Sequence, residues 1–261
     1  MLLRNLLGTA ALVATTAEAQ SLAARIKGAP DGEVRITFAA REGLCGDGES
    51  YIRDRSHGPG NYITMNNWNG SKRWRERECL DGPVRVALKV QGGEVRSARA
   101  YVGGDWADAG RGVTDLKVLS AKQAADGLLE LARTGADDDV IFAATLADNV
   151  TIWPALLGLA KDRAVNRTNR KQAVFWLSQA AGDKAAEGLE EIVDDDDEDR
   201  ELREHAVFAL SQLPKDDGVP ILVRTAKTNR DPAIRKKAMF WLGQSDDPRA
   251  LALFEDILSK P

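Results

Sequence analysis

Cysteine and histidine are the residues of this chain that could serve as nucleophile, base or metal ligand, and both are scarce. The 261 residues include two of each type. A thiol-catalytic or metal site would use Cys45, His57 and Cys79, because thiolate and imidazole are the reactive and metal-binding groups. Metal and redox sites often show CxxC or HxxxH spacing, and the sequence has neither. We therefore expect no metal, no cofactor and no enzymatic activity.

The first 19 residues have the composition of a secretory signal peptide. One basic residue, Arg4, precedes an apolar run at 6–14, and small residues lead into an A-x-A cleavage pattern at 17–19. The apolar run is shorter than the roughly 20 residues that span a bilayer. We therefore predict cleavage after Ala19, a periplasmic or secreted location, and no membrane insertion.

Export changes the interpretation of the two cysteines. Cys45 and Cys79 would meet an oxidising compartment as the only pair in the chain, so we predict a disulfide between them. Closing that loop would restrict the unfolded chain by roughly 4 kcal/mol. The alternative is a hydrolase that uses Cys45 with His57, and it requires a free thiol at Cys45.

Residues 20–119 have the pattern of a small β domain. Apolar and polar residues alternate around 34–38, 84–90 and 95–102, and Gln91-Gly92-Gly93 predicts a hairpin between the last two segments. We predict a disulfide-closed antiparallel sheet followed, from residue 120, by a helical domain, which gives an α+β fold class with two domains.

The stretch between the cysteines is rich in Gly, Asn, Arg and Trp, and we predict that it is mostly loop. Basic residues surround Trp68 and Trp74, an arrangement that could contact a glycan or a small ligand. The same tryptophans could instead close a small core beneath solvated arginines. Both interpretations remain open.

The helical part begins where Ser120 and Gln123 form a capping-box pattern. Apolar spacing of three and four residues then continues to the end of the sequence. We predict helices near 120–133, 137–147, 151–161, 167–179, 183–193, 200–212, 217–226, 232–243 and 248–259.

This part of the sequence repeats itself. The segments 170–179, 203–212 and 235–244 are close copies, 33 and 32 residues apart, and 140–144 is a fainter copy. Such a period with two helices per unit indicates stacked hairpins, which bury their apolar faces against neighbouring units.

The last unit carries a recognisable signature. Asp231-Pro232 with Arg235, followed by Leu242-Gly243 and a second Asp-Pro pair at 247–248, resembles the short HEAT-like repeat that is also found in phycobilisome lyases. The resemblance extends over 120–261 and implies an α-solenoid that serves as a scaffold or, by repeat analogy, a lyase. It also implies that the helices near 140, 172, 205 and 237 line the concave side.

One position of these helices is phenylalanine in all four copies, and a glutamine follows one turn later in three of them. On a helical wheel both positions point away from the face marked by Ala173 and Leu177. We predict a concave binding strip that takes a protein or an extended peptide, with the alternative that the phenylalanines form inter-repeat core. The strip comprises Phe142, Phe175, Phe208, Phe240, Gln179, Gln212 and Gln244.

Charge is divided between the two parts. Residues 20–119 hold 16 basic and 13 acidic residues, whereas 120–261 hold 19 and 26, which argues against nucleic acid as a partner of the helices. The acidic run 194–199 could bind Ca²⁺, but it lacks the alternating spacing of a calcium loop, and a solvated turn is the alternative. The sequence thus predicts an exported, non-catalytic binding scaffold.

Overall fold

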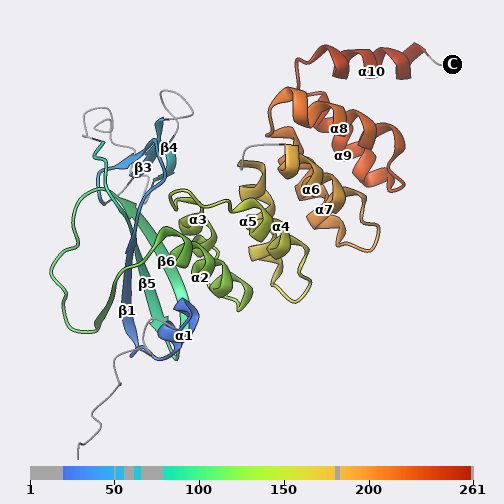
Figure 1. Cartoon of the computed structure of the whole chain (residues 1–261). Coiled ribbons are helices and arrows are strands. Elements are labelled where there is room, and N and C mark those ends of the chain that lie inside the picture. Colours follow the sequence, from blue (N-terminus) through green and yellow to red (C-terminus); the bar gives the residue numbers. More distant parts are fainter. Residues whose placement is uncertain (1–19, 50, 56–61, 66–78, 180–182, 260–261) are drawn as a thin grey trace, which may run out of the picture.

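The computed structural model describes residues 20–49, 51–55, 62–65, 79–179 and 183–259. A β region is followed by a long stack of helices, which confirms the predicted order (Figure 1). None of the helices in these ranges is long and apolar enough to cross a membrane.

The main sheet has four strands in the order β6-β5-β1-β7. Val34, Ile36 and Phe38 alternate with polar residues along β1, and all three are fully buried. The predicted strands β1, β5 and β6 pair antiparallel, and the sheet has in addition one parallel pair, between β1 and β7. The strand β7 was not predicted, because none of its side chains is buried and its apolar and polar residues alternate only weakly. The four strands are β1 (Gly32–Phe38), β5 (Val84–Gln91), β6 (Glu94–Val102) and β7 (Val113–Val118).

The predicted hairpin joins β5 to β6. Gly92 and Gly93 form its two-residue loop, with φ of 62° and 74°. Two consecutive positive φ angles match the twist of the flanking strands and favour glycine at both positions.

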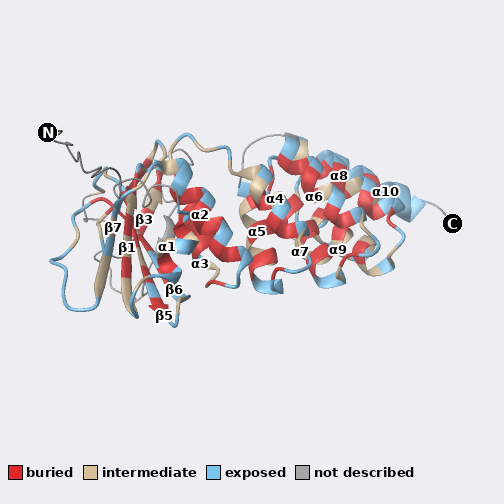
Figure 2. Ribbon diagram, turned by 60° about the horizontal axis from the view of Figure 1, so that its bottom comes forward, coloured by how far each residue is buried: buried red, intermediate tan, exposed pale blue. Residues whose placement is uncertain are grey.

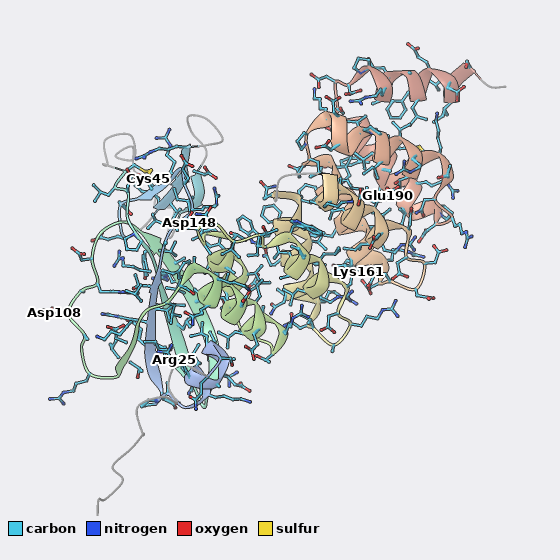
Figure 3. The ribbon with its side chains drawn as sticks, in the orientation of Figure 1. Arg25, Cys45, Asp108, Asp148, Lys161 and Glu190 are labelled. Carbon is cyan, nitrogen blue, oxygen red and sulfur yellow. A yellow bond between two sulfur atoms is a disulfide. The ribbon has the colours of Figure 1, made fainter. Side chains whose placement is uncertain are left out.

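A second, three-stranded sheet lies within residues 44–65, in the order β2-β3-β4, and Cys45 is part of its first strand. It comprises β2 (Leu44–Gly46), β3 (Tyr51–Asp54) and β4 (Tyr62–Met65), three short strands that were not predicted. Short strands separated by glycines carry too little alternation to be recognised. The predicted disulfide between Cys45 and Cys79 is confirmed and joins β2 to the segment that leads into β5 (Figure 3). His57, Trp68 and Trp74 lie outside the described residues.

One apolar core joins the sheet to the first helices. α2 packs on α1 and on β1, while α3 packs on β6. Buried residues run from the strands into these helices and along the stack (Figure 2). The first helical hairpin therefore covers one face of the sheet and also begins the stack. These elements are α1 (Leu22–Lys27), α2 (Ala121–Arg133) and α3 (Asp139–Thr145).

The helices from α2 onward form two layers (Figure 2). The odd layer contains α3, α5, α7 and α9, and the even layer contains α2, α4, α6, α8 and α10. All nine predicted helices are present, with ends shifted by at most two residues. Those not yet delimited are α4 (Trp153–Lys161), α5 (Arg167–Gln179), α6 (Asp183–Asp194), α7 (Arg200–Ser211), α8 (Lys215–Thr228), α9 (Pro232–Leu242) and α10 (Pro248–Ser259).

Candidate interaction surface

The four repeated phenylalanines all lie on the odd layer, but their exposure differs. Phe142 on α3 is 9% exposed, Phe175 and Phe208 are half-buried, and Phe240 on α9 is 55% exposed. The row therefore changes from core to surface as the stack proceeds.

Ring contacts between neighbouring repeats involve two of the four phenylalanines. The Phe142 ring stacks on Trp176 of the next odd-layer helix, with centroids 5.2 Å apart. Phe208 lies 5.0 Å from Trp241 in the same way. Such ring pairs stabilise a packed interface beyond their area burial. Phe142 and Phe208 thus contribute to contacts between repeats, whereas the ring contacts of Phe175 and Phe240 are with the tryptophan on their own helix.

The repeated glutamines lie at the carboxyl ends of the odd-layer helices, and all three are exposed. Gln212 and Gln244 line a common hollow of about 220 Å³, together with Trp241. The indole N–H of Trp241 is buried and has no acceptor among the described residues. The structure therefore brings two of the predicted glutamines to one hollow, whereas Gln179 does not line it.

The repeated arginines close the ends of even-layer helices. Arg170 Nε donates to the carbonyl of Ala160 at 2.7 Å, and Arg203 Nε donates to that of Val193 at 3.0 Å. Arg235 donates to a carbonyl just after α8 at 2.8 Å. The last carbonyls of a helix lack partners within it. The three arginines therefore have a structural role.

Carboxylates of the acidic run 194–199 form ion pairs and a helix N-cap. Glu198 binds the guanidinium of Arg170, and both side chains are less than 10% exposed. Asp196 pairs with Arg203, and Asp199 accepts from backbone N–H groups at the start of α7. No group of acidic, cysteine or histidine residues in the described parts of the chain could hold a metal ion. The run therefore stabilises the stack.

The two sequence-predicted candidates for thiol chemistry do not form a described site. Cys45 is oxidised in the disulfide, and neither cysteine is a free thiol. A nucleophilic Cys45 would require reduction of this bond.

Sequence reasoning missed a cluster on the sheet face remote from the helices. Arg35 and Arg85 lie over the ring of Trp106, at 4.7 and 5.0 Å from its centroid, and Tyr101 meets Trp106 edge-on. Trp106 lies in the loop that carries Asp108, which Figure 3 shows on this side. The available signal was that Arg35 and Arg85 each stand between two apolar residues of a predicted strand, and therefore on its opposite face.

Two further hollows lie on the β region. One, of about 960 Å³, lies on the same sheet face and is lined in part by Lys89, Arg99 and Tyr101. The other, of about 840 Å³, lies between β7 and the helices α1 and α2, with the exposed Val118 on its rim.

Comparison with known proteins bears on the end of the stack. Residues 186–261 match the family model described as HEAT repeats. No curated protein matches the chain. The match begins within α6 and extends through α10, the part in which the self-similar segments are clearest. Residues 186–261 are therefore similar to HEAT repeats, and a β region precedes the helices.

Proposed function

We propose that this chain is an exported, non-catalytic scaffold that binds a protein or an extended peptide along the odd helix layer. HEAT repeats fit a protein-interaction scaffold, and the match to this family covers α7 to α10 and most of α6. Such stacks present extended binding surfaces.

The hollow between the ends of α7 and α9 carries the proposal. Gln212 and Gln244 offer amide donors and acceptors there. An extended peptide supplies backbone carbonyls that could satisfy these donors. Phe208 and Phe240 lie on the same helices and offer apolar ring surface for its side chains.

The packing within the layers supports the odd layer as the inner side. Successive odd-layer helices α5, α7 and α9 pack more extensively on one another than α4, α6 and α8 do. The inner side of a curved stack brings its helices closer together. The Phe and Gln side chains would then lie on the concave side.

A displayed library of random peptides tests the proposal. Peptides selected on the full chain should lose at least about tenfold in affinity when Gln212 and Gln244 are both replaced by alanine, because backbone-directed hydrogen bonds are removed. Both side chains are exposed, so the variant should fold. The matched control is Gln91→Ala, an exposed glutamine at the end of β5. Selected peptides that bind the double variant and wild type equally would contradict the assignment.

Export is a separate part of the proposal. The composition of residues 1–19 and the disulfide both favour it. Sequencing the amino terminus of the protein from its native host should give Gln20 as the first residue. Recovery of the intact chain from a reducing cytosol would contradict export.

A second candidate function is binding of a glycan or small ligand by the β region. The hollow of about 960 Å³ on the open sheet face favours it, because Lys89, Arg99 and Tyr101 surround it. Binding of a glycan array by wild type, and its loss in Arg99→Ala, would support this function.

A further inference from the structure

The open face of the main sheet carries positive charge around the hollow of about 960 Å³. Lys89 of β5, Arg99 of β6 and Arg111 of the loop before β7 all line this hollow. All three residues are exposed, and none forms an ion pair with a described residue. Ala87 and Tyr101 line the same hollow. We name the surface formed by these five residues the basic hollow.

The strand register places the two strand cations side by side. Ala87 and Lys89 lie two residues apart on β5, directly opposite Arg99 and Ser97 of β6. Alternate residues of a strand share one face of the sheet. Lys89 and Arg99 are therefore diagonal neighbours on this face, and such neighbours lie roughly 7–8 Å apart. One ligand can reach both cations.

A small residue keeps the basic hollow open. Ala87 lies between the larger side chains of Arg85 and Lys89 on the same side of β5. The guanidinium of Arg85 lies 5.4 Å from the centre of the Tyr101 ring, so its charge adds to the positive potential beside the hollow. A ligand in the basic hollow therefore meets a methyl group and an aromatic ring as well as three cations.

Three carboxylates also line this hollow. Asp31 accepts from a backbone N–H of the hairpin loop at 2.7 Å, and Glu33 pairs with Arg35 at 2.6 Å. Asp139 interacts electrostatically with Arg99 but forms no ion pair with it. Each carboxylate has more than one acceptor position and can still accept from a hydroxyl group. The lining thus combines cations for an anionic group with acceptors for hydroxyl groups.

We propose that the basic hollow binds a carboxylated sugar chain, one that contains uronic acid units. The proposal rests on the second candidate function, glycan binding by the β region, and names the class of glycan. Carboxylates of the sugar bind the three cations, and the planar guanidinium groups of Arg99 and Arg111 match a carboxylate with two parallel hydrogen bonds. Hydroxyl groups donate to Asp31 and Glu33, and a sugar ring lies against Tyr101.

A single-stranded nucleic acid matches this lining less well. Proteins that bind such strands stack successive bases on several aromatic rings, and every nucleotide carries a phosphate. Tyr101 is the one aromatic residue among the described residues that line the hollow. The carboxylates of the lining would repel a ligand with a charge on every unit. A sugar chain with hydroxyl groups around its acidic groups fits better.

Oligogalacturonate provides the probe, and the same oligosaccharide with its carboxyl groups converted to methyl esters is the matched neutral ligand. In calorimetric titrations of the full chain, the acidic form should bind at least about tenfold more tightly than the ester, and its affinity should fall as salt increases. Equal binding of the two forms would overturn the carboxylate class while glycan binding itself would stand. The absence of binding to any glycan would overturn both. An oligonucleotide of equal charge that binds more tightly would also overturn the proposal.

Removal of two cations tests the site. Lys89→Gln with Arg111→Gln should weaken binding of oligogalacturonate at least about tenfold, because both residues are exposed and their loss removes charge rather than packing. The matched control is Lys122→Gln with Arg163→Gln, which makes the same change of net charge at exposed positions of the helical part. An equal effect of the two pairs would mean that the ligand responds only to net charge, and would overturn the site.

Filling the hollow tests its shape without a change of charge. Ala87→Phe places a ring between Arg85 and Lys89, and strands tolerate aromatic residues well. Binding of oligogalacturonate should fall at least about tenfold, while the circular dichroism spectrum should stay that of wild type. A folded Ala87→Phe variant that binds as wild type does would overturn the placement of the sugar in the basic hollow.

Discussion

The sheet region and the helical stack bury arginine in different ways. In the sheet region Arg85 is 5% exposed and donates to the carbonyls of Gly48 at 2.6 Å and Gly103 at 2.8 Å, beside aromatic rings. Burial lowers the pKa of this guanidinium. In the stack, Arg170 is 7% exposed and binds the carboxylate of Glu198. The sheet region surrounds its buried cation with backbone dipoles, whereas the stack pairs it with an anion.

This difference follows from the origin of the contacts. Arg85 reaches segments that are far away in sequence and have no counterpart elsewhere in the chain. The stack makes its ion pairs between neighbouring repeats, as Arg170 to Glu198 and Arg200 to Asp231 show. Stability in the stack is therefore distributed over similar interfaces, while the sheet region depends on a few unique contacts.

Removing one partner of the buried pair should give the largest effect in the stack. Arg170→Ala leaves Glu198 buried without its cation, which should cost about 3–5 kcal/mol of unfolding free energy. Denaturant unfolding followed by far-ultraviolet circular dichroism measures it.

Two further variants sharpen this test. Arg163→Ala removes an exposed pair with Asp195 and should cost less than about 1 kcal/mol. Replacing Arg170 and Glu198 together by methionine and leucine should recover much of the loss. If the exposed and buried arginines gave equal losses, the buried pair would not be a major contributor.

Breaking the disulfide should give a comparable or smaller effect, confined to the sheet region. Cys45 and Cys79 are 34 residues apart, and the loss of this cross-link should cost about 2–4 kcal/mol. The Cys45→Ala, Cys79→Ala variant should lose protection of amide hydrogens in β2 and β3 while the helices α7 to α9 keep theirs. Hydrogen exchange resolved by segment distinguishes the two regions, and equal loss in the stack would contradict their independence.

The stack and the sheet region also differ in how much of their structure the sequence predicts. The copies around Phe175, Phe208 and Phe240 predict the helices and their period, because every unit meets a similar environment. β7 and the short strands β2 to β4 have no repeat and little alternation, so only long-range pairing determines them. For the candidate surface, the wheel places the phenylalanines on one layer but cannot show that Trp176 covers Phe142. That contact depends on the rotation between neighbouring repeats.

The gradient along the phenylalanine row can be measured directly. Phe142→Leu keeps most apolar volume but removes the ring pair with Trp176, which should cost about 0.5–1.5 kcal/mol. Phe240→Leu should change the unfolding free energy by less than about 0.5 kcal/mol, because this ring is 55% exposed. Equal losses would mean that the Phe240 ring contributes to packing as much as the Phe142 ring does.

The smallest expected effect concerns the pH dependence of the stack. His205 on α7 is half-buried, with its ring centroid 5.7 Å from that of Phe208. Burial lowers the pKa of His205, the positive charges of Lys171 and Lys237 lower it further, and Glu201 acts in the opposite direction. The folded chain therefore disfavours the protonated imidazole.

The sign of the effect follows from proton linkage. The imidazole of the unfolded chain titrates near its usual pKa of about 6.5, so it takes up a proton before the folded one as pH falls. Stability from neutral His205 should be complete above about pH 6.5 and should decline as the pH falls below that value. His205→Gln should remove this decline while the loss from depressed carboxylates such as Asp247, whose pKa is about 2, appears only at much lower pH. Unfolding free energies of wild type and variant between about pH 7.5 and pH 5 check the slope. If the unfolding free energies of wild type and variant changed with pH in parallel, His205 would not be the group responsible. The neutral His205 ring beside Phe208 would then contribute through packing alone.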